Sequence, residues 1–236
     1  MKVKIIGTGS IYSKSNCAGI LIDDNILVDI GPGVIKYLIK ENFDFTKIDT
    51  IILTHLHYDH ISDLPLFLVN SEVTKVNHKI NIYGPRGTEE KITGLCQLIN
   101  NRKTDRYIKD YVSFFTYQDG SVIDAHNHHF EASEVIHGFI EAYSFLVDSK
   151  LGISGDSSLC ENIKHLAKSC NLMICDCSFE VGDKNHMGID SLIELKSLNE
   201  NLKLLPVHYR DETREKLKSM HLADIPAIDD GYDFTI

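Results

Sequence analysis

The sequence predicts an α/β fold in which two β-sheets pack face to face and helices cover their outer surfaces. Two stretches rich in short β-type runs, near residues 3–29 and 112–154, are interleaved with helix-type segments. Such a pattern favours packed layers of sheet and helix. With 236 residues, of which 43% are apolar, the chain can bury one full core. We therefore expect a single domain over 1–236, without an internal repeat or a linker.

Three short β-type runs come first and predict a meander: Val3–Ile6, Ala18–Ile22 and Ile26–Asp29. Gly33–Asn42 then carries apolar residues at the i, i+1, i+4 and i+5 positions of an amphipathic helix. Thr50–Thr54 is nearly all apolar, as expected of a buried strand that leads into a histidine cluster.

The later elements alternate between the two types, most regularly in the last third of the chain. The expected strands are Ile80–Tyr83, Val112–Tyr117, Phe130–His137, Ala142–Val147, Leu151–Ser154, Leu172–Cys175 and Leu202–Val207. The expected helices are Glu89–Asn100, Leu159–Ser169, Ile189–Leu198 and Glu212–Ser219.

Charge and hydropathy exclude several classes of partner. The formal net charge of −10 argues against a broad basic surface that would hold duplex DNA or an anionic membrane. The N-terminus reaches a glycine turn after a very short apolar run, so it lacks the apolar middle of a signal peptide. No segment approaches about 18 uninterrupted apolar residues. We expect a cytoplasmic protein with no membrane partner.

Cysteine usage indicates reduced thiols. Six cysteines are scattered through the chain, without the density of a disulfide scaffold. The pair in Cys175-Asp176-Cys177 is the one candidate for metal ligation. Because it follows the apolar run Leu172-Met173-Ile174 and lacks a second cysteine pair, the end of a buried strand is the favoured interpretation.

The densest chemical feature is His55-Leu56-His57-Tyr58-Asp59-His60, with four potential metal ligands in six residues. In an extended loop, the alternating His55, His57 and Asp59 would point to one side, while His60 could turn toward a second ion. The alternative to metal binding is a solvent-exposed turn that is rich in histidine. The residue types and spacing together favour metal binding.

The pattern His-x-His-x-Asp-His resembles the signature motif of the metallo-β-lactamase superfamily, and the resemblance extends along the whole chain. Five motifs follow in that superfamily's order: Asp29 before Gly31-Pro32-Gly33, the histidine cluster, His137 in Val135–Gly138, Asp156 in Ser154–Ser157, and His208 in Leu205–His208. The resemblance implies an αββα four-layer sandwich and a metal-dependent hydrolase.

The resemblance also implies seven ligands for two ions. They are His55, His57 and His137 for one ion, Asp59, His60 and His208 for the other, and Asp156 as the bridge. Asp29 would orient a ligating histidine through its second ring nitrogen. Two ions about 3.5–4 Å apart can bind one water, lower its pKa toward about 7 and clamp a phosphodiester. A single structural zinc needs only four ligands, so the set favours a dinuclear site.

Zinc is the metal we expect, because imidazole and carboxylate ligands suit it. The same ligands also accept manganese, iron, cobalt or nickel, so those metals stay open.

Within the superfamily, the chain is most similar to the ribonuclease Z and related phosphodiesterase branch. Its short motifs are Gly7-Thr8-Gly9-Ser10, Asp29–Gly33, Tyr83-Gly84-Pro85, Ser154–Ser157 and His186-Met187-Gly188. In that branch the last motif carries a non-ligand histidine that protonates the leaving oxygen, a role suited to imidazole near neutral pH. The candidate catalytic residues are therefore Asp59 and His186. A surface loop is the alternative setting for His186.

Three departures from ribonuclease Z shift the expected substrate. No basic, Gly/Pro-rich insertion lies between His60 and His137, and the basic segment Asn101–Arg106 is short. Ile174–Phe179 replaces the His-Glu-Ala-Thr-type segment that is usual in ribonuclease Z. Pro206–Arg210 differs from the Thr/Asn-His-Phe form that is common around the last histidine of that enzyme. A small phosphodiester, such as a cyclic nucleotide or short oligonucleotide, becomes as plausible a partner as an RNA 3′ end.

Two rival functions remain open. A carboxyl-type hydrolase would cleave a thioester, lactone or lactam on the same scaffold. The resemblance implies that the thioesterase and lactamase branches do not carry a histidine like His186 at the start of a helix. A metal-binding protein without catalysis would not need an intact set of seven ligands. The branch resemblance further implies a homodimer.

The other histidines have no role in this scheme. His126, His128 and His129 are expected in a polar loop between two strands. His78, His165 and His221 are expected at the surface.

Overall fold

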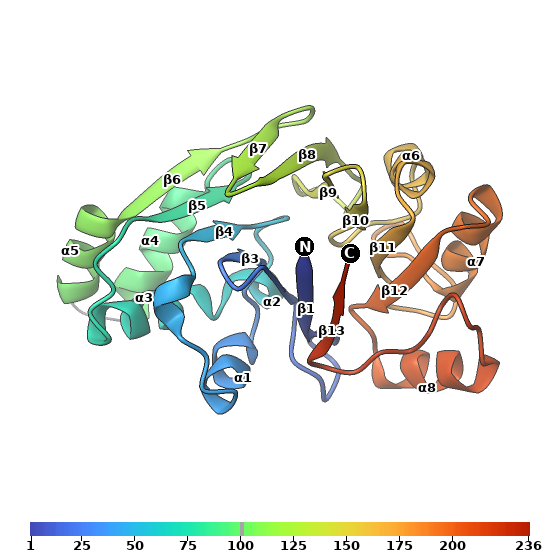
Figure 1. Cartoon of the computed structure of the whole chain (residues 1–236), viewed down its shortest axis with the longest axis horizontal. Helices are drawn as coiled ribbons and strands as arrows, with labels where there is room; N and C mark the ends of the chain where they lie inside the picture. Colours follow the sequence, from blue (N-terminus) through green and yellow to red (C-terminus); the bar gives the residue numbers. More distant parts are fainter. Residues whose placement is uncertain (100–101) are drawn as a thin grey trace.

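The first sheet forms one of two central layers. The computed structural model describes residues 1–99 and 102–236, and its elements form two stacked sheets between two groups of helices (Figure 1). The first sheet has the strand order β13-β1-β2-β3-β4-β5-β6. Its strands are β1 Lys2–Gly7, β2 Gly19–Ile22, β3 Ile26–Val28, β4 Thr50–Ile52, β5 Ile80–Gly84, β6 Val112–Thr116 and β13 Tyr232–Thr235. Because β1 pairs with β13, the two ends of the chain lie side by side.

The second sheet has the order β12-β11-β10-β9-β8-β7. Its strands are β7 Val122–Ala125, β8 His128–Glu134, β9 Tyr143–Val147, β10 Leu151–Ile153, β11 Leu172–Asp176 and β12 Lys203–Val207.

Parallel pairing positions the chemistry at one edge of each sheet. Strands β3 to β6 run parallel, and so do β10 to β12. The carboxyl ends of parallel strands meet at the same edge of a sheet. The histidine cluster follows β4, while Asp156, Asp176 and His208 follow or end β10, β11 and β12.

Helices form the two outer layers. The first sheet is covered by α1 Val34–Lys40, α3 Leu64–Val73, α4 Thr88–Ile99 and α5 Arg102–Tyr111. The second sheet is covered by α6 Glu161–Ser169, α7 Ile189–Leu198 and α8 Asp211–Met220. The short elements are α2 Tyr58–Ile61 and the 3₁₀ turn Phe45–Lys47. In the part of the chain that the structure describes, no helix is long and apolar enough to cross a bilayer.

Three apolar clusters fill the three interfaces between these four layers. Ile51 packs outward toward α1 and α3, whereas its neighbour Ile52 packs inward between the sheets. Met173 and Ile174 divide in the same way on β11. Successive side chains of a strand point to opposite faces, so a strand buried on both faces reads as an unbroken apolar run. The predicted αββα sandwich of the metallo-β-lactamase type is confirmed.

Several elements were not predicted from the sequence, among them α3, α5, β7 and β13. Helix α3 is apolar on several sides, so it lacks the one-sided stripe that marks an amphipathic helix. Helix α5 is mostly charged and buries few side chains, among them Tyr107 and Ile108. Strand β13 is short and depends on pairing with β1, at the other end of the chain. The expected ends of two segments, Asn100 and Asn101, lie outside the described residues.

Candidate active site and metal centre

The histidine cluster begins as predicted but then turns into a helix. His55 leaves β4 with its side chain fully buried, and His57 precedes the first turn of α2. Asp59 and His60 lie inside α2 and are buried. The prediction of an extended loop is therefore wrong from Tyr58 onward. Because neighbouring residues on a helix point in different directions, the turn sends Asp59 and His60 to separate positions.

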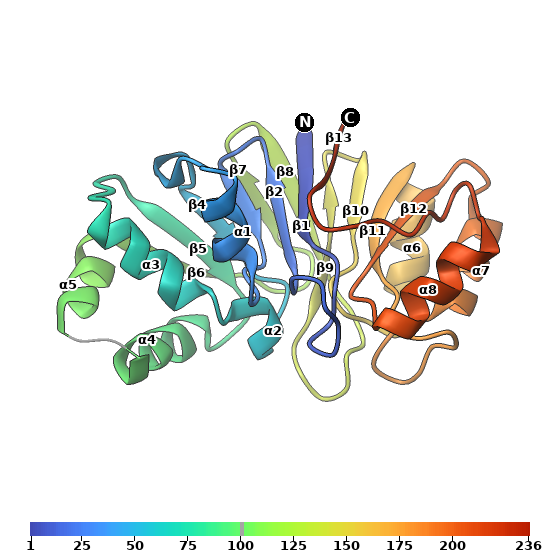
Figure 2. The same cartoon turned by 90° about the horizontal axis from the view of Figure 1, so that it is seen from below.

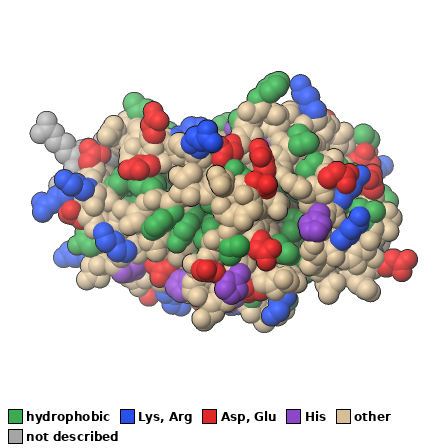
Figure 3. Space-filling model, turned by 90° about the horizontal axis from the view of Figure 1, so that it is seen from above, with side chains coloured by type: hydrophobic (Ala, Val, Ile, Leu, Met, Phe, Trp, Pro, Cys, Tyr) green, Lys and Arg blue, Asp and Glu red, His purple; other side chains and the backbone are tan. Residues whose placement is uncertain are grey.

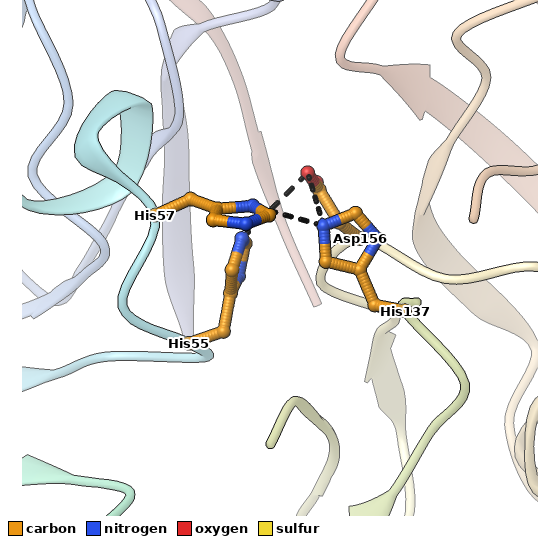
Figure 4. Close-up of side chains that lie close together, drawn as sticks. All are labelled: His55, His57, His137 and Asp156. Carbon is orange, nitrogen blue, oxygen red and sulfur yellow. Dashed lines mark hydrogen bonds and ion pairs between the residues drawn. The ribbon is translucent and has the colours of Figure 1, made fainter. Parts of the chain in front are cut away.

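The first group of ligand-type side chains is His55, His57, His137 and Asp156, whose potential ligand atoms all lie within 4.8 Å of one another. Figure 4 shows the three imidazole rings converging with the carboxylate of Asp156. Nε2 of His137 lies 3.0 Å from Nδ1 of His57. The Asp156 carboxylate oxygen Oδ2 lies 3.9 Å from Nε2 of His137. This is a pocket of donor atoms of the size that one cation fills.

The second group is Asp59, His60, Asp156 and His208, within the same limit of 4.8 Å. Oδ2 of Asp156 lies 3.3 Å from Nε2 of His60 and 3.2 Å from Nε2 of His208. Nε2 of His208 also lies 3.2 Å from Oδ2 of Asp59. Asp156 belongs to both groups, so its carboxylate is placed where a bridging ligand would stand.

The donor set fits divalent cations. Among the described residues, Nε2 of His55 and of His60 are buried atoms without a hydrogen-bond partner. A buried polar atom left unpaired costs free energy, so such atoms point to a missing partner. Burial, reinforced by the charge of His60, holds the pKa of His55 well below its usual value and keeps that ring in the neutral form that binds metals.

Asp156 stays ionised in this setting. Its burial favours the protonated acid, but the charges of His208 and His60 outweigh burial and hold the pKa well below its usual value. An ionised carboxylate is the form that binds metals.

Hydrogen bonds fix the orientation of three imidazoles through their other ring nitrogen. His60 donates from Nδ1 to Asp29 at 2.8 Å, the contact expected of Asp29. His137 donates from Nδ1 to the carbonyl oxygen of Asn185 at 2.8 Å. Nδ1 of His208 lies 2.8 Å from the hydroxyl of Ser178. In each case Nε2 remains directed toward Asp156, as second-layer partners of metal-binding histidines do.

The backbone at the site adopts uncommon conformations. Asp29 and His208 have φ of 57° and 60°, in the left-handed region that non-glycine residues seldom occupy. Gly155 precedes Asp156 with φ of 59°, and a Cβ there would lie 2.8 Å from the carbonyl oxygen of Tyr143. A Cβ on Gly31 would lie 1.9 Å from the carbonyl oxygen of Asp59. These glycines let the motif loops approach closely.

His186 lies beside the two metal-ligand groups, and together with Asp156, Asp176 and His208 it forms a third cluster of ligand-type side chains within the same limit of 4.8 Å. Its ring stacks on that of His208, with centroids 5.1 Å apart and an angle of 13°. Nδ1 of His186 donates to Oδ2 of Asp176 at 2.8 Å. Burial opposes protonation of His186, but the charge and hydrogen bond of Asp176 outweigh it and raise the pKa to about 9. The ring thus lies at the edge of the site, and the carboxylate of Asp176 stabilises its protonated form.

Asp176 is a candidate site residue that sequence reasoning missed. Its carboxylate is fully buried and also accepts hydrogen bonds from the backbone of Ser157 and from the backbone and hydroxyl of Ser178. The available signal was an aspartate that ends an apolar strand, between two cysteines. The interpretation of this segment as a strand end is confirmed, and within the described residues neither Cys175 nor Cys177 belongs to a possible metal-binding group.

An open cavity of about 190 Å³ leads to these groups. Its inner wall contains His57, Asp59, Asp156, His186 and His208. Its lining also includes the exposed Tyr12 and Tyr58 and the half-buried Phe179 and Arg210. The arrangement suits a small anionic molecule that reaches the donor groups from one side.

The remaining histidines lie elsewhere. His126 occupies a turn, but His128 and His129 lie in β8, so the prediction of a loop is wrong for those two. All three contact carboxylates. Figure 3 shows histidine side chains beside acidic ones along the lower edge of the face that it draws. Two histidines lie at the surface as expected, His165 and His221, while His78 is half-buried.

A comparison of the sequence with protein families gives one decisive match. A family model described as Anti-Pycsar protein Apyc1 matches residues 1–225. The chain belongs to this family. Together with the fold and the paired His/Asp groups, the match makes the protein a metal-dependent hydrolase of the metallo-β-lactamase fold.

Curated relatives point to the same superfamily. The chain is 25% identical over 235 residues to the Anti-Pycsar protein Apyc1 of Bacillus phage 010DV004, covering 91% of each protein. It is 29% identical over 158 residues to ribonuclease Z of Latilactobacillus sakei, covering 64% of this chain and 49% of that protein. The chain thus spans about half the length of the ribonuclease Z relatives it matches.

A solved structure supports the fold. The metallo-β-lactamase fold protein YhfI from Bacillus subtilis superimposes with a TM-score of 0.79. The two chains are 21% identical, and the superposition covers 99% of this chain and 98% of that one.

Proposed function

We propose that the protein hydrolyses a small phosphodiester, with a cyclic nucleotide as the first candidate. The observation that carries this proposal is the pair of Asp176 and His186, which sets a protonatable imidazole beside the two ligand groups. An alkoxide that leaves phosphorus needs a proton. Kinship with the Apyc1 family and with ribonuclease Z supports phosphodiester chemistry over acyl transfer.

Two divalent cations would be held by the seven predicted ligands. One would bind among the first group and the other among the second, with Asp156 shared: His55, His57 and His137, then Asp59, His60 and His208. When bound, such ions lower the pKa of water and neutralise charge on the phosphate. Zinc is our first candidate because five of the seven ligands are imidazoles, while manganese and iron suit the same atoms.

His186 would protonate the leaving oxygen. Its Nδ1 proton is committed to Asp176, so Nε2 is the ring atom free to donate. The buried carboxylate of Asp176 fixes the ring and stabilises its protonated form. Stacking on His208 holds the ring next to the ligand groups, where the leaving oxygen would depart. Asp59 would bind the second ion, and its carboxylate would form part of the cavity wall where the reaction takes place.

Surface charge favours a small substrate over a transfer-RNA precursor. Next to His137, a second open cavity is lined by the acidic Asp119, Glu134 and Glu141, with Arg86 as the basic residue. Acidic side chains repel a nucleic-acid backbone. The basic residues Arg102, Lys103 and Arg106 lie in the first turns of α5, at one end of the molecule, whereas α2 lies near its middle (Figure 2).

The test is a rate comparison with purified, metal-replete protein. The substrates are cyclic nucleotides, bis-p-nitrophenyl phosphate, a 3′-extended precursor transfer RNA, a thioester and a lactone. The proposal predicts the highest kcat/KM on a cyclic nucleotide. Faster cleavage of the precursor RNA would restore the ribonuclease Z alternative, and faster turnover of a thioester or lactone would replace phosphodiester chemistry altogether.

We also retain a homodimer as a prediction. Light scattering of the purified protein measures it directly, and a monomer mass at micromolar concentration would contradict it.

A further inference from the structure

A short turn in the loop between β11 and α7 is closed by the side chain of Asp183. Its backbone N–H donates to the carbonyl oxygen of His186 at 2.8 Å. In return, its Oδ1 accepts hydrogen bonds from the backbone N–H groups of Asn185 and His186, both at 2.8 Å. These three bonds close residues 183–186 into one unit.

This turn supports two sides of the site through adjacent residues. The carbonyl oxygen of Asn185 accepts the hydrogen bond that Nδ1 of His137 donates, at 2.8 Å. The next residue, His186, presents its own Nδ1 to Asp176 at 2.8 Å. The rings of His137 and His186 lie with centroids 4.7 Å apart, at an angle of 70°. One turn therefore fixes both a member of the first ligand group and the candidate proton donor.

The start of α7 holds the chain in front of the turn. The backbone N–H of Gly182 donates at 2.9 Å to Oδ1 of Asp190, the second residue of α7. A Cβ on Gly182 would lie 2.8 Å from the hydroxyl of Ser191 and 3.0 Å from the backbone nitrogen of Gly188. Because the chain is packed tightly there, the geometry of the turn itself depends on the carboxylate of Asp183.

We propose that Asp183 is a positioning residue for both the first ligand group and the proton donor. Its Oδ1 fixes two backbone N–H groups, a role that aspartate often takes in turns. This sets the carbonyl group that orients His137 and the ring that reaches Asp176. The inference rests on the proposed function for the role of His186, and on the ligand groups alone for the role of His137.

The first experiment compares two leaving groups in Asp183→Ala at saturating metal. The side chain is exposed, so this change removes no core contact. We expect kcat on a cyclic nucleotide to fall about tenfold with little change in KM, a size typical of groups that support a functional histidine. Bis-p-nitrophenyl phosphate needs little help from an acid and should lose less than about twofold. A merely structural defect would lower both rates equally.

Asp183→Asn separates position from charge. Its amide oxygen can accept the same two hydrogen bonds, so this variant should keep at least about half of the wild-type kcat on the cyclic nucleotide. If Asp183→Asn is as slow as Asp183→Ala, the charge of the carboxylate matters and not the geometry of the turn, and the positioning role is overturned.

A second readout does not depend on turnover. Cobalt-loaded protein is titrated with a chelator while the visible absorption of bound cobalt is followed. Asp183→Ala should release one ion at about tenfold lower chelator concentration than wild type, because His137 loses its support. The other ion should leave at the wild-type concentration.

Asp44→Ala is the matched control. Asp44 is also exposed, and its Oδ1 accepts hydrogen bonds from the backbone N–H and the hydroxyl of Thr46, at 3.0 and 2.6 Å. It belongs to neither ligand group and does not line the cavity. Its loss should leave both the substrate ratio and cobalt release unchanged.

Each outcome decides the matter. An unchanged substrate ratio or unchanged cobalt release in Asp183→Ala would overturn the joint role while the proposed function stands. If wild type cleaves no phosphodiester, the proposed function fails. Cobalt release then decides alone, and equal release from Asp183→Ala and wild type would overturn the inference.

Discussion

Asp176 accepts a hydrogen bond from Nδ1 of His186 at 2.8 Å, and its carboxylate is entirely buried while the histidine borders the open cavity. A buried anion beneath a partly exposed imidazole both orients the ring and favours its protonated form. The pair therefore links the interior of the second sheet to the place where a substrate would bind.

Replacing the Asp176 carboxylate should slow turnover without loss of metal. Asp176→Asn keeps the shape of the side chain but removes the charge that stabilises protonated His186. We expect kcat to fall about 10- to 100-fold on a nucleotide diester, a size typical of residues that orient a catalytic group. Steady-state kinetics with parallel metal analysis checks this, and a reduced metal content would contradict it.

Asp156→Ala should be the most damaging ligand change, because Asp156 alone belongs to both ligand groups. The variant should bind fewer than two ions per chain after reconstitution, and its activity should fall to background. Metal analysis after chelator-free purification measures the stoichiometry. His55→Ala is the comparison, since His55 belongs only to the first group and its loss should spare the second ion. Two ions and normal turnover in Asp156→Ala would refute the bridging role.

A histidine far from the site should give stability a pH dependence. Nδ1 of His128 bonds Asp148 at 2.6 Å, and Nε2 bonds Asp23 at 2.7 Å, which ties β8 to turns of both sheets. Burial lowers the pKa of His128, but the two carboxylates outweigh it and raise the pKa above 6.5. Burial raises the pKa of Asp23 and Asp148, but hydrogen bonds outweigh it and lower the pKa of both below 3.8.

The sign of the effect follows from these directions. The stability contributed by His128 is fully present below about pH 6.5 and is lost as pH rises through its raised pKa. The contribution of the two carboxylates is present above about pH 4 and is lost as pH falls through their lowered pKa. Urea unfolding should therefore show His128→Gln less stable than wild type by up to about 1 kcal/mol near pH 5.5, with a smaller difference at pH 9. If the difference in unfolding free energy between His128→Gln and wild type is the same at pH 5.5 and at pH 9, the ion pairs of His128 with Asp23 and Asp148 do not stabilise the fold.

The sequence predicted most of the layers, because strands buried on both faces, such as Thr50–Ile52, read as unbroken apolar runs. It also predicted the ligand set, since four ligands are adjacent and the others stand in recognisable motifs. Asp176 was missed for a physical reason. Its candidate role depends on a contact with His186, a residue from the loop that follows β11 and returns to the site. No local pattern encodes such a contact.

The most direct test of the account is the effect of His186→Ala on two leaving groups. Without its proton donor, the protein should cleave a cyclic nucleotide about 100- to 10,000-fold more slowly. The weakly basic p-nitrophenolate departs with little help, so bis-p-nitrophenyl phosphate should lose less than about tenfold. Metal content should match that of wild type. Equal losses on both substrates, or a loss of bound metal, would contradict the assignment of His186 as the acid of a phosphodiesterase.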